Sequence, residues 1–330
     1  MNVSYMSEPI PVRQSFIAAK LGIKNIIRFE IPKQYVEKHL NVVDRNGEKI
    51  SAHHRPTWFF RFLYDCSAGN VLMHGLTVPI ISKLAGTFLN SGASKILIPS
   101  FIRRNNIDMS EFSAGPYDNF NEFFCRKILD GKRFIDENPN SIISPCDGKV
   151  QVFPINDDSS FEIKGISYTL EKLLCSEKLA KQFNGGTLML LRLGVDDYHR
   201  YSYPVDGSYD GYTRVGGKLH TVNPYVASRR PIYAENSREY CVIKTESMGD
   251  VLMMEVGALM VGRIVNKFPN GKVKRGEEKG YFKFGASSIV LCFEKNAVIP
   301  DAELIRNTLN GAETKIKLGE RIALTADTEE

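Results

Sequence analysis

Two adjacent serines near the C-terminal end of the chain are candidates for chemistry. Ser287 and Ser288 follow the small residues Gly285 and Ala286, and they precede the apolar run 289–293. This composition is typical of an ordinary turn between strands. The alternative is a backbone held open so that a serine hydroxyl acts as a nucleophile. Polar clusters elsewhere in the chain bear on this choice.

Four such clusters precede the serines, and they are richer in polar side chains than folding requires. They read SPCDG at 144–148, DDYHRYSYP at 196–204, GKLHTVNP at 217–224 and ENSRE at 235–239. A single cluster of this kind is usual in a surface loop, and Asp-Gly is a common turn pair. Four clusters that end in a serine pair indicate one site assembled from several loops.

Asp147, His199 and Ser287 supply the groups of an acid, a base and a nucleophile. In such an arrangement a histidine oriented by an aspartate takes the proton of a serine hydroxyl. No G-x-S-x-G nucleophile elbow surrounds Ser287, which argues against an ordinary esterase. The Rossmann and P-loop fingerprints are also absent, so no nucleotide is implied.

Composition sets broad limits on the protein. The 330 residues are 43% hydrophobic and 25% charged, an average globular mixture. The net charge of +5 argues against dedicated nucleic-acid binding but allows attraction to anionic surfaces. Six scattered cysteines form no C-x-x-C pair, so a metal site is not expected. With no signal-peptide pattern and no apolar run of about 18 to 20 residues, we expect a soluble or peripheral protein on the inner side of a cell.

The elements that must position the clusters change in character along the chain. Residues 1–50 form a polar lead-in, and the aromatic cluster 58–62, the apolar segment 71–89 and residues 95–105 predict two or three helices. Their apolar faces are bordered by basic side chains, namely Arg61, Lys83, Lys95, Arg103 and Arg104. This pattern suits helices that lie on an anionic bilayer, and the alternative is that they pack on the main domain.

A further amphipathic helix is predicted at 117–128, capped by Asp118 or Asn119. Beyond Arg133 short β-rich runs take over, with one helical segment at 170–183. The predicted strands are 142–143, 149–155, 187–193, 239–245, 251–256, 259–265 and 289–293. The sequence therefore predicts an α+β fold, in which an N-terminal helical region, 1–133, is followed by a strand-rich catalytic domain of mostly antiparallel sheet, 134–330.

Taken in order, these segments resemble the phosphatidylserine decarboxylase proenzyme family. The resemblance is to the bacterial branch whose maturation motif reads Gly-Gly-Ser-Thr. It rests on YDNFNEFFCRKI, SPCDG, DDYHRYSYPVDG, LHTVNP, ENSRE, VEVGALMVGRI and KRGEEKGYFKFGASS, which run from about Tyr117 to Phe293. Their order and spacing carry the match, because no single motif decides it.

The resemblance implies a proenzyme that cuts itself between Ala286 and Ser287. The products would be a β chain, 1–286, and an α chain, 287–330, which form a heterodimer and allow a further dimer. The cofactor would be a pyruvoyl group made from Ser287, which serves as an electron sink as pyridoxal phosphate does elsewhere.

The implied reaction is the decarboxylation of phosphatidylserine to phosphatidylethanolamine. The protein would then be peripheral at the cytoplasmic face of the cell membrane, with a phospholipid substrate and an anionic membrane surface as partners. Two alternatives stay open: a pyruvoyl-dependent decarboxylase of a soluble amino acid, and a non-maturing lipid-binding relative.

The resemblance also implies roles for single residues. Asp147 would be the orienting acid of maturation, Ser287 the nucleophile, and His199 the histidine that works on the substrate. The family commonly has a second histidine as the processing base, where this chain has Ser202. A serine hydroxyl cannot replace imidazole as a base. Either His199 or His220 then supplies the base, or the protein does not mature; we favour the first because the other site segments are intact.

The remaining differences and candidates are less specific. Ala286 replaces a glycine and restricts the backbone, whereas Ser288 in place of threonine keeps a hydroxyl. Arg200 is expected to bind a phosphate or carboxylate of the substrate or to form a structural salt bridge. His220 is a second candidate for substrate binding. No role is derived for Asn236, Arg238 and Glu255. The basic run Lys272, Lys274 and Arg275 is expected to be a solvated loop, and the alternative is a contact with lipid headgroups.

Overall fold

A computed structural model describes residues 41–50, 86–222, 227, 231–258, 263–267 and 270–326. The polar lead-in up to residue 40 and the aromatic cluster 58–62 lie outside these residues, as do residues 71–85 of the predicted apolar segment and residues 259–262. The described part is α+β, with a few helices before a strand-rich region, which confirms the predicted fold class.

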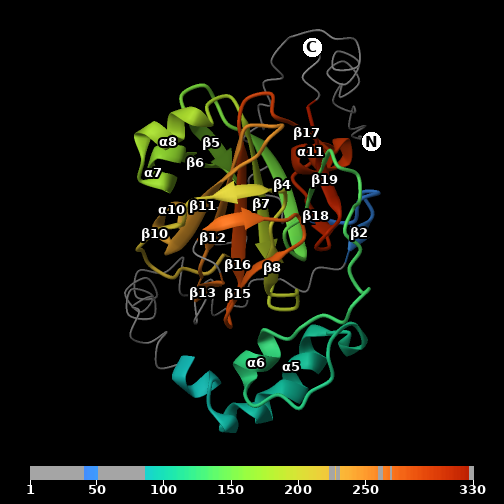
Figure 1. Ribbon diagram of the computed structural model, residues 1–330. Coiled ribbons are helices and arrows are strands. Elements are labelled where there is room, and N and C mark those ends of the chain that lie inside the picture. Colours follow the sequence, from blue (N-terminus) through green and yellow to red (C-terminus); the bar gives the residue numbers. More distant parts are fainter. Residues whose placement is uncertain are drawn as a thin grey trace, which may run out of the picture. The chain divides into compact units, whose positions relative to one another are not determined.

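The largest sheet has eleven strands and contains the predicted serine nucleophile (Figure 1). Its neighbouring strands are antiparallel except for the parallel pair β1 and β18. The order is β14 (Gly271–Val273), β9 (Gly207–Tyr209), β11 (Arg238–Lys244), β12 (Asp250–Val256), β16 (Ser287–Phe293), β7 (Thr187–Leu193), β4 (Gly148–Pro154), β18 (Glu313–Ile316), β1 (Val42–Val43) and β2 (Lys49–Ile50), with β10 (Thr213–Val215) beside β11.

Smaller sheets and short helices surround this sheet. The three-stranded sheets are β13 (Ile264–Asn266), β15 (Glu278–Phe282) and β8 (Arg200–Ser202), and β17 (Val298–Pro300), β19 (Arg321–Thr325) and β3 (Ser141–Ile143). A two-stranded sheet pairs β5 (Ser160–Ile163) with β6 (Ile166–Thr169). The helices are η2 (Gly92–Leu97), α5 (Ile98–Asn105), η3 (Met109–Glu111), α6 (Phe120–Phe124), α7 (Leu170–Leu174), α8 (Glu177–Gln182), α10 (Ile232–Glu235) and α11 (Ala302–Leu309).

The central strands form where the sequence carries unbroken apolar runs. All seven residues of β16 are buried, as expected for a strand covered on both faces. The strand begins two residues earlier than the apolar run predicts, because Ser287 and Ser288 pair with Leu193 and Arg192 of β7. Ser287 is therefore the first residue of a buried strand and not part of an open turn.

The predicted helix at 95–105 is present as η2 followed by α5, whereas the helices predicted at 117–128 and 170–183 are shorter than expected. α6 ends at Phe124, and its N-cap is Asn119, whose side chain accepts the backbone N–H of Glu122 at 2.9 Å. The predicted helix at 170–183 is two helices, because Cys175 adopts a left-handed conformation with φ of 52° between α7 and α8. Such a residue ends a helix.

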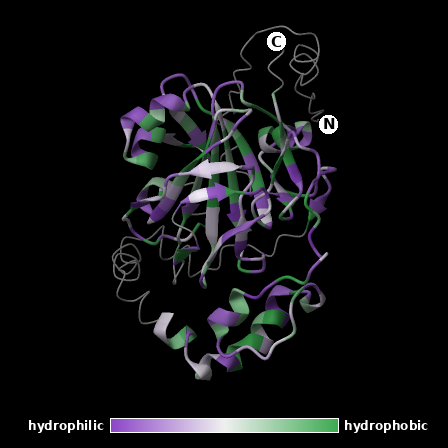
Figure 2. Ribbon diagram, viewed as in Figure 1, coloured by the Kyte–Doolittle hydropathy of each residue, from purple (hydrophilic) through white to green (hydrophobic). Residues whose placement is uncertain are grey.

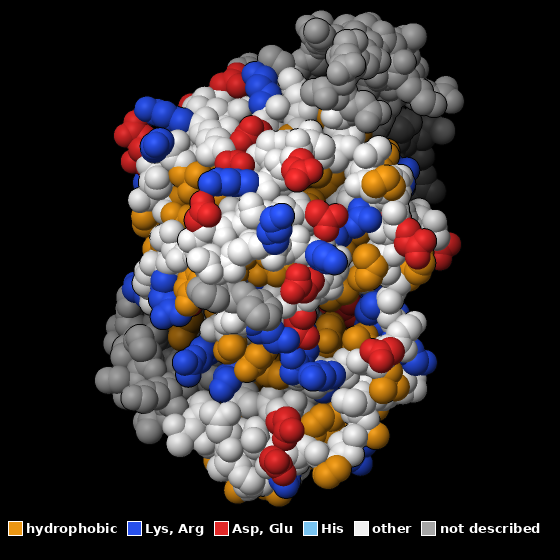
Figure 3. All heavy atoms as spheres, viewed as in Figure 1, with side chains coloured by type: hydrophobic (Ala, Val, Ile, Leu, Met, Phe, Trp, Pro, Cys, Tyr) orange, Lys and Arg blue, Asp and Glu red, His pale blue; other side chains and the backbone are white. Residues whose placement is uncertain are grey.

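An aromatic cluster holds α5 and α6 together. Buried Leu89, Phe120, Phe123 and Phe124 pack with partly buried side chains that include Phe101 of α5. Hydrophobic and hydrophilic segments alternate along these helices (Figure 2). Hydrophobic side chains also reach the surface over them, beside Lys and Arg (Figure 3). No helix among the described residues is both long and apolar enough to cross a membrane.

Candidate active site

Ser287 lies at the buried end of β16. Its side chain is 0% exposed, and its hydroxyl is 3.5 Å from the carbonyl oxygen of Gly285. Gly285 has φ of 141°, in the region that favours glycine. The glycine bends the chain immediately before the strand, so the Ala286 carbonyl and the Ser287 hydroxyl belong to one tight segment. β12 and β7 hold the strand from both sides.

His199 is fixed at the end of the neighbouring strand β7. Its Nε2 lies 2.8 Å from the carbonyl oxygen of Gly194, one residue beyond the strand. A carbonyl only accepts, so Nε2 carries the proton and Nδ1 has a free lone pair. Among the described residues, no hydrogen-bond partner reaches Nδ1. The ring stacks on Phe124 at 4.0 Å, and burial lowers the pKa of His199 to about 3.

Asp197 and Lys149 form a buried ion pair that shapes the same turn. The carboxylate of Asp197 accepts both the Lys149 ammonium and the backbone N–H of Gly194, each at 2.6 Å. Burial alone would raise the pKa of Asp197, but Lys149 and the backbone donor hold it below its usual value. Gly194 is thus held through its N–H by Asp197 and through its carbonyl by His199. Sequence reasoning missed Lys149, whose only signal is a charged residue in a strand-like run.

Asp147 lies on the other side of β7, in the loop before β4. Its carboxylate accepts Nε and Nη2 of Arg133 at 2.9 and 2.5 Å, and the backbone N–H of Leu318 at 2.9 Å. The loop is joined to the turn between β18 and β19 by backbone bonds from Ser144 to Glu320 and from Gly319 to Ser144. A bidentate arginine and a backbone donor therefore fix this carboxylate.

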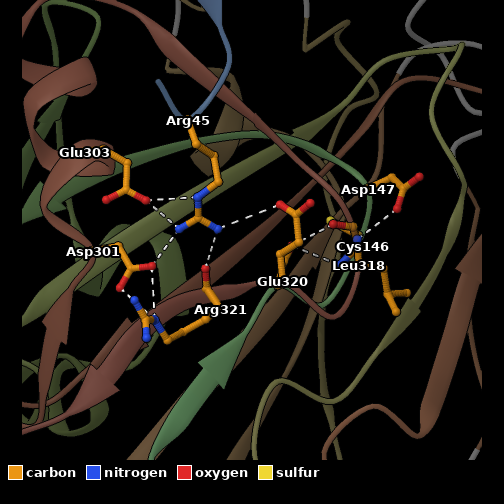
Figure 4. Close-up of polar contacts among 9 residues, drawn as sticks. Arg45, Cys146, Asp147, Asp301, Glu303, Leu318, Glu320 and Arg321 are labelled. Atoms are coloured by element: carbon orange, nitrogen blue, oxygen red, sulfur yellow. Dashed lines mark hydrogen bonds and ion pairs between the residues drawn. The ribbon is translucent and has the colours of Figure 1, made fainter. Parts of the chain in front are cut away.

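A charged network around Arg45 lies beside that turn and reaches Glu320 in it (Figure 4). Arg45 pairs with Asp301 at 2.6 Å and with Glu303 at 2.6 Å, and it donates to the carbonyl of Arg321 at 2.7 Å. Arg321 also pairs with Asp301 at 3.1 Å. Residues far apart in the sequence thus brace the turn that holds Asp147.

The three predicted residues lie at or near the ends of three neighbouring strands, β4, β7 and β16. Gly148 of β4 lies against the Arg192–Leu193 peptide of β7, and Leu193 pairs with Ser287 of β16. Two strand spacings, about 10 Å, separate the β4 and β16 backbones. Asp147 and Ser287 therefore lie on either side of β7. His199 is hydrogen-bonded to Gly194, the residue directly beyond the end of β7. The structure brings the acid, the histidine and the nucleophile to one end of the sheet.

Comparison with known proteins shows the family. The family model for phosphatidylserine decarboxylase matches residues 120–324. A phosphatidylserine decarboxylase proenzyme 2 from Clostridium acetobutylicum is 43% identical over 81% of this chain and 92% of its own length. Proenzymes from Fusobacterium nucleatum and Clostridium tetani are 40% and 37% identical, over 87% and 83% of this chain and 96% and 93% of their own lengths. The chain belongs to the phosphatidylserine decarboxylase family. The recognition made from the motifs is confirmed.

Ser202, at the position of the second histidine common in the family, lies beside the Asp147 loop. Its backbone N–H donates to the carbonyl of Pro145 at 2.8 Å, and the residue is 4% exposed. The position therefore has the neighbourhood expected of a group that works with Asp147. Its hydroxyl supplies no base at neutral pH.

His220, the other candidate base, lies on the opposite side of β16. Asn236 accepts the backbone N–H of His220 and donates to its carbonyl and to that of Gly257, each at 2.8 Å. Gly257 follows Val256, the partner of Ser288. The His220 ring lies 3.3 Å from Glu235. The two histidines therefore flank the serine strand, one through β7 and the other through β12. Asn236 joins the backbone of His220 to Gly257 at the end of β12.

Arg200 and Arg238 use their donors on the protein itself. Arg200 donates to the carbonyl of Cys125 and to Glu278, each at 2.8 Å, and its guanidinium lies over the Tyr281 ring. Arg238 donates to backbone carbonyls of the α7 and α10 regions, at Lys172, Leu173, Ala234 and Asn236. For Arg200 the structure contains the salt bridge that was one of its two predicted roles. Its role toward the substrate stays a prediction.

Glu255 is also paired inside the protein. The Lys279 ammonium lies 2.7 Å from both of its oxygens, and Asn266 bonds to both side chains. Glu255 faces Ile289 across β12 and β16, two residues from Ser287. This network stabilises the strand pair next to the nucleophile. By contrast, Lys272 is exposed on β14, and the half-buried Arg275 donates to the carbonyl of Ser141 at 2.8 Å.

Proposed function

We propose that this chain is a self-processing phosphatidylserine decarboxylase, which converts phosphatidylserine to phosphatidylethanolamine with a pyruvoyl group made from Ser287. The observation that carries the proposal is a buried Ser287 behind a left-handed Gly285, with a neutral histidine fixed at the end of the adjacent strand. Membership of the family supplies the substrate.

The processing step uses atoms that the strand start holds close together. The Ser287 hydroxyl oxygen attacks the Ala286 carbonyl carbon, and the peptide C–N bond gives way to an ester. β-Elimination removes the α-proton of residue 287 and breaks the bond between its Cβ and the ester oxygen, which leaves a carboxylate on Ala286 and a dehydroalanine, in equilibrium with its imine, at the new N-terminus. Hydrolysis of the new N-terminus releases ammonia and leaves the pyruvoyl group. The products are a β chain, 1–286, and an α chain, 287–330, which we propose stay together as a heterodimer.

His199 is the proposed base for this step. Its Nδ1 lone pair is free, and its lowered pKa leaves the ring neutral at pH 7. It can therefore take a proton, as a weaker base than an ordinary histidine. The Asp197 carboxylate acts on the same ring and favours its charged form. In this assignment His199 takes the role of the family histidine that Ser202 replaces. His220, which lies against Glu235, is the second candidate.

The residues around Ser287 fit a pyruvoyl group at that position. The carbonyl supplies an electron sink for decarboxylation when it is formed. β12 and β7 fix the strand that would carry it, and Phe284 packs on Phe124 with ring centroids 5.0 Å apart. Phe124 also stacks on His199. We propose that these rings keep water from the reacting position.

The helical region before residue 134 is proposed to contact an anionic membrane at the cytoplasmic face. Phe88 is 49% exposed and Ile96 is 78% exposed, and Arg103 and Arg104 are exposed in the last turn of α5. Exposed apolar side chains next to basic ones favour such a contact. The same region meets the cleavage motif, because Asn121 of α6 accepts the backbone N–H of Phe284 at 3.1 Å. These features favour a lipid substrate over a soluble amino acid.

An assay of carbon dioxide release tests the proposal. The purified protein is expected to decarboxylate phosphatidylserine in detergent mixed micelles and to leave free serine unchanged. Pretreatment with borohydride, which reduces a ketone, is expected to abolish the reaction. Turnover of free serine at an equal rate, or full activity after borohydride, would contradict the proposed substrate or cofactor.

A further inference from the structure

Arg126 lies two residues beyond the end of α6 and carries a buried guanidinium without a hydrogen-bond partner among the described residues. The residue is 2% exposed, and its Nε, Nη1 and Nη2 atoms have no hydrogen-bond partner within the described residues. Its guanidinium carbon lies 4.1 Å from the centroid of the Phe112 ring and 5.1 Å from that of Phe123. The cation thus rests on two aromatic faces while its five N–H donors stay unpaired.

This situation is costly and differs from that of the other buried arginines. Arg192 pairs with Glu313, and Arg238 donates to backbone carbonyls. A buried charge without a partner lowers stability unless a bound group repays it. Contacts with aromatic faces repay only part of that cost. The unpaired donors therefore point to an anion that the chain itself does not provide.

Arg126 also lies next to the proposed active site. Phe124, two residues earlier, stacks on His199, and the carbonyl of Cys125 is bound by Arg200. Burial is the main cause that lowers the pKa of His199, and the positive charge of Arg126 adds to it. The negative charge of Asp147 acts on Arg126 in turn. An anion bound at Arg126 would thus lie within reach of the groups that act on the substrate.

We propose that Arg126 binds the phosphodiester of the phospholipid substrate. This inference rests on the proposed function and assigns the headgroup contact within it. A planar guanidinium binds two oxygens of a phosphate at once, which the point charge of a lysine does not.

The phosphate suits Arg126 better than the substrate carboxylate does. The carboxylate loses its charge as carbon dioxide departs, so a strong ion pair with it would stabilise the ground state more than the transition state. The phosphodiester keeps its charge throughout the reaction, and a bond to it costs nothing at the transition state. The guanidinium ends a flexible side chain beside Phe123, and cutting after Ala286 frees the chain end that carries Phe284. The proposed contact requires that the Arg126 side chain, which is 2% exposed, rotate toward the headgroup.

Arg126→Met tests the inference, because methionine keeps the length and removes the charge. The variant is expected to split into two chains normally and to melt no lower than the unaltered protein. Its KM for phosphatidylserine in mixed micelles should rise roughly 10- to 100-fold, with kcat nearly unchanged, as for a bond present equally in ground and transition states. Arg306→Met, an exposed arginine on α11, is the control for loss of one charge and should leave KM unchanged.

A phosphate-free probe separates the two anions. The O-dodecyl ether of serine keeps the amine and the carboxylate but has no phosphate. The unaltered protein and Arg126→Met should turn it over with equal kcat/KM. A loss with this ether equal to that with phosphatidylserine would assign Arg126 to the carboxylate and overturn the inference. An unchanged KM for phosphatidylserine would overturn it too.

A second variant tests the inference if Arg126→Met does not fold or mature. Arg126→Lys keeps the charge and loses the planar fork, so its KM should rise severalfold with phosphatidylserine and stay unchanged with the ether. An unchanged KM for both substrates in this variant would overturn the inference. Inactivity of the unaltered, fully split protein toward phosphatidylserine would instead contradict the proposed function, so the two failures are distinguishable.

Discussion

The Nε2 atom of His199 lies 2.8 Å from the carbonyl oxygen of Gly194, and this single bond fixes which ring nitrogen is free. Gly194 directly follows Leu193, the residue that pairs with Ser287. The orientation of the proposed base is therefore set by the strand next to the nucleophile.

Replacing His199 by glutamine should slow self-cleavage. Glutamine still donates a hydrogen bond to Gly194 but offers no base, and loss of a general base costs about 10²- to 10⁴-fold. The fraction of uncut chain, followed over time on a denaturing gel, measures the effect. His220→Gln is the matched comparison and should split at the usual pace. If only the His220 variant splits slowly, His220 and not His199 is the base.

His199 should also make the protein less stable in mild acid. Its pKa is about 3 in the folded chain and 6.5 in the unfolded chain, so the unfolded state binds more protons as the pH falls below 6.5. The stabilisation is complete above pH 6.5 and is lost progressively toward pH 3. Between pH 7 and pH 5 this costs about 2 kcal/mol. Denaturant unfolding at several pH values should show this slope in Ser287→Ala and a flatter one in Ser287→Ala with His199→Gln.

Glu313→Gln should destabilise the protein strongly. The Glu313 carboxylate pairs with Arg192 and, at 2.9 Å, with Lys164, and all three groups are buried. Burial opposes ionisation, but the two cations hold the pKa of Glu313 well below its usual value. Removing the carboxylate leaves buried cations unpaired, at a cost of about 3 to 5 kcal/mol. Chemical denaturation measures the loss, and Glu177→Gln, in an exposed pair with Lys181, should cause none.

Arg103→Gln with Arg104→Gln should weaken binding to anionic vesicles. Each basic residue near such a surface contributes about 1 kcal/mol, so the double variant should bind about 30-fold more weakly at low salt. Sedimentation with phosphatidylglycerol vesicles measures this, and the difference should shrink as salt is added. Neutral phosphatidylcholine vesicles serve as the control. Equal binding of both proteins to anionic vesicles would remove α5 from the membrane contact.

Asn121→Ala should slow maturation through the contact between α6 and the cleavage motif. The side chain accepts the N–H of Phe284, one residue before Gly285, and donates to Asn90 at 2.9 Å. Without it the segment before Ser287 loses a fixed point, and small misplacements of reacting groups cost up to about 100-fold in rate. Asn121→Asp keeps the acceptor and should split faster than Asn121→Ala. Equal rates for the two variants would show that the contact does not position the motif.

The apolar strands were predictable from sequence, whereas the polar ones were not. Thr187–Leu193 was predicted with its observed bounds, because an unbroken apolar run marks a buried strand. The short strand Arg200–Ser202 has no such signal and forms only because Glu278 and its neighbours lie beside it. The start of β16 was missed for the same reason, since two serines favour a turn locally but pair with β7 in the fold.

The candidate site was predictable as a set of residues but not as a geometry. Order and spacing indicated Asp147, His199 and Ser287. The partners that fix them lie elsewhere in the sequence: Arg133 binds Asp147 from 14 residues away, and Lys149 binds Asp197 from 48 residues away. Sequence patterns do not specify such pairs. Arg200 illustrates the limit, because its salt bridge with Glu278 depends on two strands meeting.

Denaturing mass spectrometry of freshly purified protein tests the central claim most directly. The account predicts two chains, 1–286 and 287–330, with the smaller one lighter by one ammonia than simple hydrolysis would give. Ser287→Ala should remain a single chain of full mass. An unaltered protein that stays in one piece, or a Ser287→Ala protein that still splits at this bond, would contradict the proposed chemistry of Ser287.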